Sequence, residues 1–354
     1  MHIPTDLIAF GVALLASLGA TIPVRHLALR FGMVDHPNAR KVHLKPIPLL
    51  GGIAIYLGFV LAVLLTLHHA PQQQIIGILA GATLLAIVGL LDDGDMLHHQ
   101  VKLFIGMPAA AIFLIASGIR ADIINVLVPG RLGMALDICL TILWVVAITA
   151  SFSILDHMDG LCAGTAAIAA FFFAISASMW GQTMVQTLAF AAFGAALGFL
   201  RWNFSPAKIF MGDGGAMLLG FLMATLGLKV HPSGDQFPGT WMIPILILGF
   251  PIFDTALVSI SRARRGLLPF TSPGKDHTAH RLSNLGLGHR GAVLVLYALS
   301  ILFGLLSMAA VRLSAARDYT LFAVLVILAA IAIIALESAP YERQGKFQKS
   351  SPAP

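Results

Sequence analysis

Long apolar blocks recur along almost the whole chain and limit what it can fold into. Each block is near the ~20 residues that a helix needs to cross the hydrocarbon core of a bilayer. Hydrophobic residues make up 58% of the 354 residues and charged residues only 11%, which is too apolar for a soluble domain of this length. The sequence therefore predicts an all-α, polytopic integral membrane protein with about ten or eleven transmembrane helices. The blocks are 6–24, 48–67, 74–91, 102–119, 137–155, 160–180, 183–200, 214–230, 239–260, 291–311 and 320–337.

Basic residues indicate which loops face the cytoplasm. Lys and Arg gather after the first, seventh and ninth blocks and in the C-terminal tail, whereas the opposite loops hold few. Because cytoplasmic loops carry an excess of Lys and Arg, the N-terminus is predicted outside and the C-terminus in the cytoplasm. Residues 1–337 would form a single transmembrane domain, and the polar segment 338–354 a disordered tail.

The net charge of +6 suggests that the chain binds anionic partners. The basic residues are separated by apolar blocks, which argues against nucleic-acid binding. Anionic lipid headgroups of the membrane, or a polyphosphate substrate, suit them better.

Carboxylates collect where apolar blocks begin or end on the predicted cytoplasmic side. Asp92 and Asp93 directly end one block, Asp156 and Asp159 begin another, and Asp213 begins a third. Ionised groups at a bilayer are costly, so the adjacent pair indicates either the solvated end of a helix or part of a metal-bound active site. Helix capping alone would account for Asp213 and for one of the pair Asp156 and Asp159.

The interiors of the blocks carry almost no ionisable groups, and Asp254 is the nearest exception. A transporter would be expected to place such groups near the middle of the bilayer. The one-sided distribution favours an enzyme at the cytoplasmic face over a transporter.

The candidate ligands favour a hard cation. Carboxylate oxygens suit Mg²⁺ or Mn²⁺. Zinc would need more nitrogen and sulfur ligands than His277 and His280 supply, because Cys139 and Cys162 both lie in apolar blocks. Glycines beside Asp213 would also allow a phosphate to approach the backbone closely.

These motifs, in this order, resemble the polyprenyl-phosphate N-acetylhexosamine-1-phosphate transferases. The resemblance covers residues 35–43, 46–48, 51–52, 89–93, 156–161, 203–213, 276–282 and 287–290. It implies a membrane fold of ten or eleven helices with the active site in a cytoplasmic groove. A homodimer is plausible on the same ground.

The resemblance also implies a reaction at the bacterial inner (plasma) membrane. A sugar-1-phosphate, from N-acetylglucosamine or a related N-acetylhexosamine, would pass from a UDP-sugar to polyprenyl (undecaprenyl) phosphate. UMP would leave, and the product would begin a lipid-linked glycan of the cell envelope.

By the same resemblance, particular residues have expected roles. Asp92, Asp93 and Asp156 would be catalytic, and Asp213, Asp92 and Asp156 would hold Mg²⁺ or Mn²⁺. The candidates for substrate binding are Lys41, His43 and Lys102 for the lipid phosphate; His277, His280 and Arg281 for the diphosphate; Phe210 for stacking on uracil; and Asn203 and Asp159 near the nucleoside.

One segment departs from the family pattern. Many members carry two asparagines shortly before the acidic pair, whereas this chain has Ala150-Ser151-Phe152-Ser153. The Ser153 hydroxyl or the ring of His157 could complete the polar shell that those amides supply. A non-catalytic relative, acting as a lipid- or nucleotide-binding membrane scaffold, therefore remains the alternative.

Overall fold

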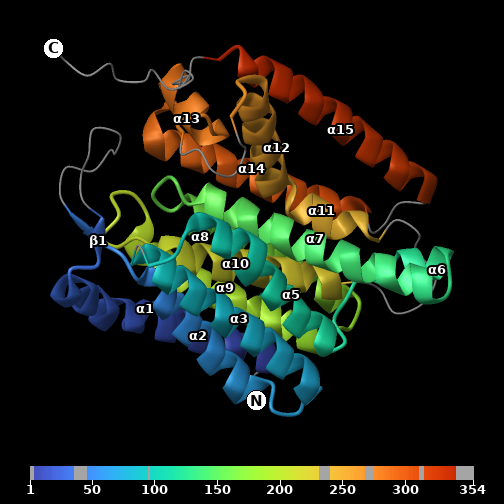
Figure 1. Cartoon of the computed structure of the whole chain (residues 1–354), viewed down its shortest axis with the longest axis horizontal. Helices are drawn as coiled ribbons and strands as arrows, with labels where there is room; N and C mark the ends of the chain where they lie inside the picture. The colour runs from blue at the N-terminus through green and yellow to red at the C-terminus, as the bar shows by residue number, and fades with distance from the viewer. Residues whose placement is uncertain are drawn as a thin grey trace.

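The protein is described here from a computed structural model, and the fold is a bundle of helices (Figure 1). The described residues are 4–35, 46–94, 96–230, 240–267, 274–310 and 315–339. The elements are α1 (Thr5–Phe31), β1 (Val34–Asp35), β2 (Ile47–Pro48), α2 (Gly51–Thr66), α3 (Gln72–Asp93), α4 (His99–Val101), the π-helix η1 (Lys102–Gly106), α5 (Met107–Ala116), α6 (Ile124–Leu127), α7 (Arg131–Leu155), α8 (Leu161–Met179), α9 (Thr183–Asn203), α10 (Gly212–Lys229), α11 (Met242–Ile247), α12 (Gly249–Arg264), α13 (Thr278–Leu282), the π-helix η2 (Ser283–Leu287), α14 (Gly288–Ala310) and α15 (Ala315–Glu337).

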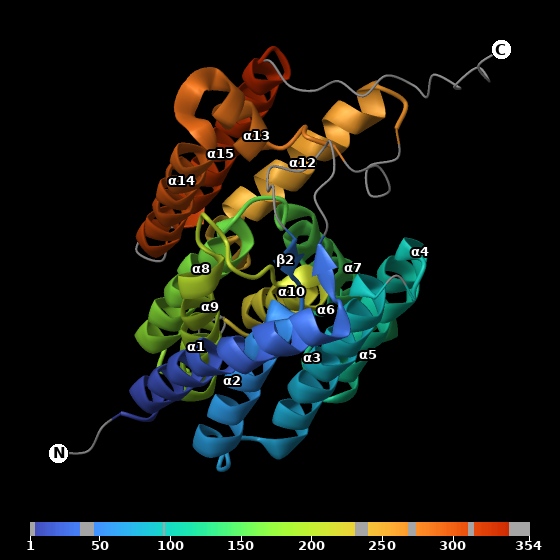
Figure 2. The same ribbon diagram turned by 90° about the vertical axis from the view of Figure 1, so that its left-hand side faces the viewer.

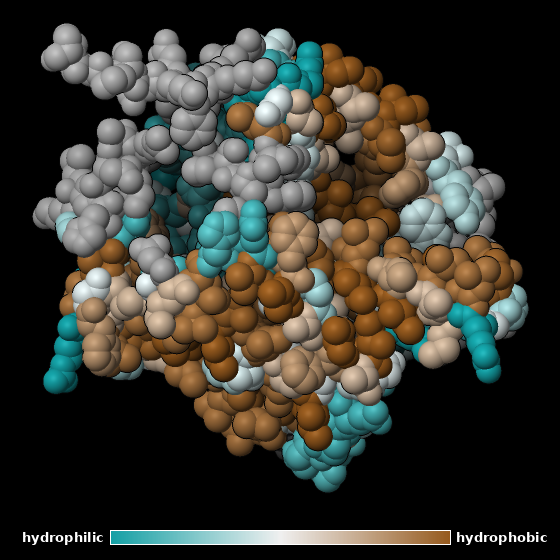
Figure 3. Space-filling model, in the orientation of Figure 1, coloured by the Kyte–Doolittle hydropathy of each residue, from teal (hydrophilic) through white to brown (hydrophobic). Residues whose placement is uncertain are grey.

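The prediction of a multi-pass membrane protein agrees with these helices. Within the described ranges, seven helices are long and apolar enough to cross a membrane, and Gly51–Thr66 and Lys102–Ala116 are shorter apolar helices. Apolar side chains cover the middle of the face in Figure 3, while hydrophilic ones gather toward its ends and in a recess at the upper left. Such an apolar belt suits a lipid environment.

α10 is the central helix of the bundle. Its residues from Gly214 to Gly227 are all buried, and α2, α3, α7, α8 and α9 pack around it. A helix that is apolar on every side is stable only where other elements cover it completely. The N-terminus of α10 therefore lies inside the bundle, surrounded by the ends of other helices.

Glycine contacts set how closely α2 and α3 approach α10. A Cβ atom on Gly89 would lie 2.1 Å from the Cα of Gly214, and one on Gly52 would lie 2.3 Å from the backbone nitrogen of Gly215. Small residues allow helix backbones to come this close in membrane proteins. Because Gly89 lies one turn before the end of α3, this contact brings Asp92 and Asp93 to the first turn of α10.

Two predicted blocks are interrupted in the structure. The block 239–260 is divided at Leu248 into α11 and α12. Pro251 explains the break, because its ring lacks an N–H and clashes with the carbonyl four residues earlier in a regular helix. The block 102–119 is a helix that opens with the wide turn η1 at Lys102–Gly106.

α12, α14 and α15 form a layer beside the main bundle. Figure 2 shows α12, α14 and α15 together above the helices α1 to α10, and Figure 1 shows α15 at the outer edge of the molecule. α11 and α14 pack against each other, and α14 also contacts α8. The segment 274–282, which joins the layer to the cavity described next, lies at the same end of the molecule as the N-terminus of α10.

Candidate active site

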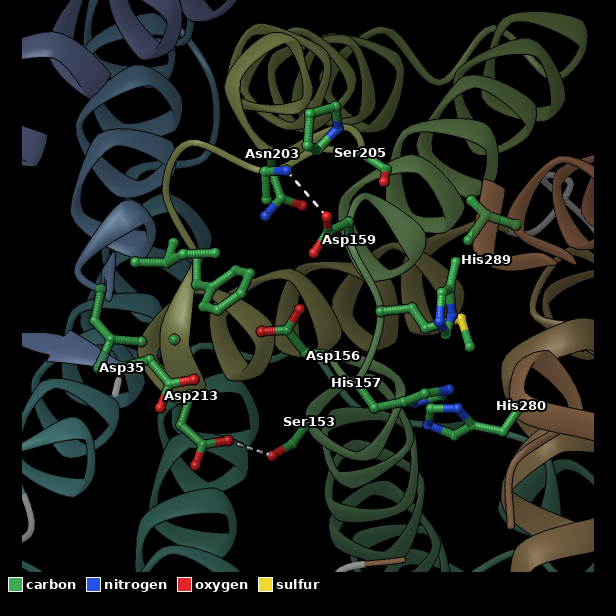
Figure 4. Close-up of a pocket in the computed structure, with 18 of the residues that line it drawn as sticks. Asp35, Ser153, Asp156, His157, Asp159, Asn203, Ser205, Asp213, His280 and His289 are labelled. Atoms are coloured by element: carbon green, nitrogen blue, oxygen red, sulfur yellow. Dashed lines mark hydrogen bonds between the residues drawn. The ribbon is translucent and has the colours of Figure 1, made fainter. Parts of the chain in front are cut away.

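A cavity of about 580 Å³ opens at one end of the bundle, where α3, α7 and α9 end and α8 and α10 begin. Its volume lies within the roughly 300–1,000 Å³ typical of small-molecule sites. Four carboxylates line it, from Asp35, Asp156, Asp159 and Asp213. Figure 4 shows that these side chains come from different elements and face a common space. Residues distant in the sequence thus form one anionic wall.

Asp213, in the first turn of α10, is the centre of a polar cluster. Its Oδ1 accepts a hydrogen bond from the Ser153 hydroxyl at 2.8 Å, and its Oδ2 lies 2.5 Å from Lys102 Nζ. The same ammonium group lies 2.7 Å from Asp92 Oδ2. One cation is therefore held between two carboxylates, and the serine at the departing position of the family pattern contacts Asp213.

Asp93 faces away from this cluster. Its carboxylate accepts the backbone N–H of Asp213 at 2.8 Å and that of Gly214 at 3.4 Å. It thereby binds N–H groups that the first turn of a helix leaves without intrahelical partners. Gly212 has φ +71°, and a Cβ atom there would lie 2.3 Å from the Asp93 carboxylate. Asp93, predicted as catalytic, is thus placed to anchor α10, and Asp92 is the member of the pair that joins the polar cluster.

Asp156 lies in the turn between α7 and α8 and lines the cavity. Among the described residues, its carboxylate has no hydrogen-bonding partner. Desolvation raises the pKa of Asp156 well above its usual value, and the negative charges of Asp213, Asp93 and Asp159 raise it further. A carboxylate in this state would be stabilised by a cation brought into the cavity.

Asn203 and Asp159 hold the cavity loops together. The Asn203 side chain accepts the Gly160 N–H at 3.0 Å and donates to the Ile209 carbonyl at 3.0 Å, and Asp159 accepts the Ala207 N–H at 2.9 Å. Both residues also line the cavity. Their predicted place beside a substrate is compatible with this geometry, but their side chains already support the loop backbone.

Two histidines line the opposite wall, and a third histidine and a buried aspartate support them from behind. The ring of His157 stacks on His277 with centroids 3.9 Å apart, and His280 lies 4.9 Å from His157. Asp254 of α12 accepts from His277 Nδ1 at 2.8 Å and from the Thr278 N–H at 2.8 Å. His157 and His280 line the cavity, whereas His277 lies behind them.

One ring nitrogen of His157 has no hydrogen-bond partner among the described residues. This nitrogen, Nε2, is buried. Burial lowers the pKa of His157 well below its usual value, and the neighbouring His277 and His280 lower it further. The ring is therefore neutral near pH 7.

Arg281 does not line the cavity. Its side chain is completely buried and bonds to Ser261 of α12 and to Leu336 and Glu337 of α15. The predicted contact of Arg281 with a diphosphate is therefore replaced by a structural network. Lys275 and His289, which the sequence prediction omitted, line the cavity instead.

Asp276 is bound by Arg262 of α12 and by Arg265, the residue that directly follows this helix. Arg262 donates to it at 3.0 and 2.9 Å, and Arg265 also contacts it. Although burial alone would raise the pKa of Asp276, the hydrogen bonds and charge of Arg262 outweigh that effect and lower the pKa to about 2. This ion pair fixes the start of the segment that carries Lys275 and His280.

The remaining predicted residues are either at the cavity or outside the described part of the chain. Phe210 lines the cavity, and its N–H donates to the Pro48 carbonyl at 2.8 Å, beside the β1–β2 pair that brings Asp35 to the wall. Lys41 and His43 lie outside the described residues. Asp35 belongs to a motif noted in the sequence but was not assigned to the site.

The donor set suits a hard divalent cation bound together with a substrate. Among the described residues, no three His, Cys, Asp or Glu side chains form a ready-made metal site. Mg²⁺ is commonly bound by only one or two carboxylates together with water and substrate phosphates. Asp213 and Asp156 offer such oxygens at the cavity wall, and the ammonium of Lys102 shows that a cation is accommodated between Asp92 and Asp213.

The cavity residues lie largely within a region shared with known proteins. Residues 75–231 match the model of glycosyl transferase family 4. This region includes Asp92, Asp156 and Asp213.

Three relatives are similar over most of their length. A probable undecaprenyl-phosphate N-acetylglucosaminyl 1-phosphate transferase of Bacillus subtilis is 36% identical, with 93% of this chain and 90% of that protein covered. A decaprenyl-phosphate N-acetylglucosaminephosphotransferase of Mycolicibacterium smegmatis is 33% identical, with 78% and 75% covered. An undecaprenyl-phosphate alpha-N-acetylglucosaminyl 1-phosphate transferase of Escherichia coli K12 is 29% identical, with 78% and 77% covered.

Proposed function

The chain belongs to glycosyl transferase family 4, and we propose that it transfers N-acetylglucosamine 1-phosphate from UDP-N-acetylglucosamine to a polyprenyl phosphate. The predicted family and enzyme class, a polyprenyl-phosphate sugar-1-phosphate transferase, are confirmed by the relatives. The non-catalytic scaffold is not favoured. The observation that carries the proposal is the cavity, where Asp156 and Asp213 face His157 and His280 at one end of a membrane bundle.

We place this cavity on the cytoplasmic side of a bacterial inner membrane, with the N-terminus outside. Basic residues in the last turns of three helices that end near the cavity support the orientation. They are Arg30 in α1, Arg201 in α9, and Arg262 and Arg264 in α12. Short loops rich in Lys and Arg face the cytoplasm. A cytoplasmic cavity would receive a soluble UDP-sugar and a lipid phosphate held at the membrane surface.

Asp213 and Asp156 would hold Mg²⁺ or Mn²⁺ in the working enzyme. The ion would offset the charge of the donor diphosphate and stabilise the departing UMP. Ser153 orients the Asp213 carboxylate through its 2.8 Å hydrogen bond. Asp93 fixes the backbone of the same residue, so Asp213 is held by two neighbours before any substrate arrives.

The acceptor needs positioning more than strong base catalysis. A phosphate monoester has a second pKa near 6, so the lipid phosphate is mainly dianionic at pH 7. One of its oxygens would attack the phosphorus that carries the sugar, and the bond to the UMP phosphate would break. Lys102 would pair with the acceptor phosphate, and Asp92 would orient Lys102 through their 2.7 Å contact.

The donor would occupy the other part of the cavity. Phe210 offers an aromatic face for uracil. Lys275 and His280 lie on the wall opposite the carboxylates and would contact the diphosphate. The buried Nε2 of His157 is a further polar group on this wall.

Substitution of the central carboxylate tests the proposal. We expect Asp213→Asn to reduce UMP release from UDP-N-acetylglucosamine and undecaprenyl phosphate by at least ~100-fold, because the neutral amide would hold the divalent cation on the donor diphosphate much less strongly. Asp122→Asn is the matched control, since Asp122 is an exposed carboxylate at the opposite end of the bundle. Lipid-linked product would be followed in parallel, with and without Mg²⁺. Undiminished product from Asp213→Asn would remove this site assignment, and binding of both substrates by the wild type without product would favour the scaffold.

A further inference from the structure

α15 is attached to the described structure near its two ends. None of residues 319–337 is fully buried, and Figure 1 shows the helix at the edge of the molecule. Toward one end, the ring of Phe322 lies 5.5 Å from that of Trp241, edge to face. At the other end, Leu336 and Glu337 bond to Arg281 of α13, and Glu337 also lies near Arg264 of α12. The long middle of α15 thus contributes little packing, and its last turn makes specific polar contacts.

Those contacts converge on Arg281, whose side chain is completely buried. Nη1 donates to the Leu336 carbonyl at 2.5 Å, and Nη2 donates to Glu337 Oε1 at 2.8 Å. Nη2 also donates to Ser261 Oγ at 3.1 Å, and Nε to the Asp276 carbonyl at 2.9 Å. A buried guanidinium is stable only when its charge is paired and its N–H groups are bonded. α15 supplies a carboxylate for that charge.

Arg281 also stabilises the C-terminal end of α15. The last carbonyls of a helix have no intrahelical partner, and the C-terminus carries partial negative charge. The Arg281 guanidinium donates to the carbonyl of Leu336 in the last turn of α15, which also accepts the Ala339 N–H at 3.1 Å. Arg264 lies 3.7 Å from the other oxygen of Glu337, but its side chain is 67% exposed, so this second contact is screened by solvent.

Arg281 belongs to the segment 274–282, and this segment carries cavity residues. Lys275 and His280 line the cavity, and His280 is the residue directly before Arg281. The same guanidinium bonds to the Asp276 backbone beside Lys275. Arg281 therefore links the end of α15 to both cavity residues through very short stretches of chain.

We propose that Glu337 is a positioning residue and that the last turn of α15 is a latch that holds Lys275 and His280 in place for the donor diphosphate. The proposal rests on the proposed function for the identity of the donor. Without the Glu337 carboxylate, the buried Arg281 guanidinium loses its paired charge and must bind another anion or water. The segment 274–282 then shifts, while the acidic residues around Asp213 stay in place.

Kinetics of Glu337→Ala and Glu337→Gln test the latch. We expect the KM for UDP-N-acetylglucosamine to rise about tenfold in Glu337→Ala and less in Glu337→Gln, with the KM for undecaprenyl phosphate unchanged. Ile334→Ala is the matched control, because Ile334 lies on the same turn region of α15 with a side chain 73% exposed. Its constants should equal those of the wild type. A loss of kcat with both KM values unchanged in the Glu337 variants would overturn the positioning role.

Hydrogen exchange of the segment gives a second readout that does not depend on activity. In Glu337→Ala we expect faster amide exchange across residues 276–282 and unchanged exchange across residues 212–220 of α10. Equal exchange in wild type and variant would overturn the latch even if the enzyme were active. If the wild type released no UMP, the proposed function would fail, and the exchange result would still decide whether the latch exists.

Discussion

The two walls of the cavity are built in different ways. The acidic wall, formed by Asp156 and Asp213 with Asp92 behind them, depends on backbones that touch at Gly89 and Gly214. The segment 274–282 is instead held by long side chains, through Arg262 on Asp276 and through Arg281. Close backbone packing tolerates almost no displacement, whereas ion-pair networks can rearrange. We therefore expect the acidic wall to be the rigid part of the site and the segment 274–282, called the variable wall below, to be the part that can shift.

The largest loss of activity should follow from adding one methyl group where the backbones of the acidic wall touch. We expect Gly89→Ala to reduce kcat about 100-fold, because a Cβ atom 2.1 Å from Gly214 Cα forces α3 away from α10 and displaces Asp92 from Asp213. Gly11→Ala is the control, since a Cβ at Gly11 meets nothing within 4 Å. UMP release by the two purified variants provides the measurement. Equal activity of both would mean that the close contact does not position the acidic wall.

A smaller effect is expected inside the same wall from Ser153. Its hydroxyl donates to the Asp213 carboxylate, and hydrogen bonds to charged groups contribute roughly 1.5–3 kcal/mol. Ser153→Ala should therefore lower kcat about tenfold, if part of that contribution is felt in the transition state. Ser153→Asn, which provides an amide at this position, should retain more activity than Ser153→Ala. The reverse order in a side-by-side UMP assay would show that the hydroxyl does not orient Asp213.

The sequence predicted the apolar helices and the acidic motifs because both depend on local composition and order. It could not distinguish the two members of the pair Asp92 and Asp93, since their directions depend on how α3 meets α10. The contact of Gly89 with Gly214 sets that register, and it joins segments far apart in the sequence. Only the fold shows that Asp93 binds the N–H groups of α10.

The role of Arg281, in the segment 274–282, could not be predicted from the sequence either. A basic residue beside two histidines is a reasonable candidate for a phosphate ligand. Its actual partners include Glu337 at the end of the last described helix, and no local pattern near Arg281 indicates that contact. In the sequence, Asp254 stands out only as an ionisable group near the end of an apolar block, and its hydrogen bond to His277 is visible only in the fold.

The smallest predicted effect concerns stability at low pH on the variable wall. The pKa of Asp276 is lowered to about 2, below its value of about 4 in an unfolded chain. Its ionised form therefore stabilises the fold fully above about pH 4, and that contribution is lost as the pH falls toward 2. Asp276→Asn should lower the Tm of the detergent-purified protein near pH 6, and the difference from the wild type should narrow between pH 4 and pH 2.

The exposed control Asp122→Asn distinguishes this effect from general acid unfolding. Its Tm should follow that of the wild type across the whole pH range, because an exposed carboxylate gains little from folding. A Tm difference for Asp276→Asn that stayed constant down to pH 2 would mean that the side chain stabilises the segment 274–282 through shape and hydrogen bonding, without its charge. The variable wall would then be held by packing, like the acidic wall, and the contrast between the two would disappear.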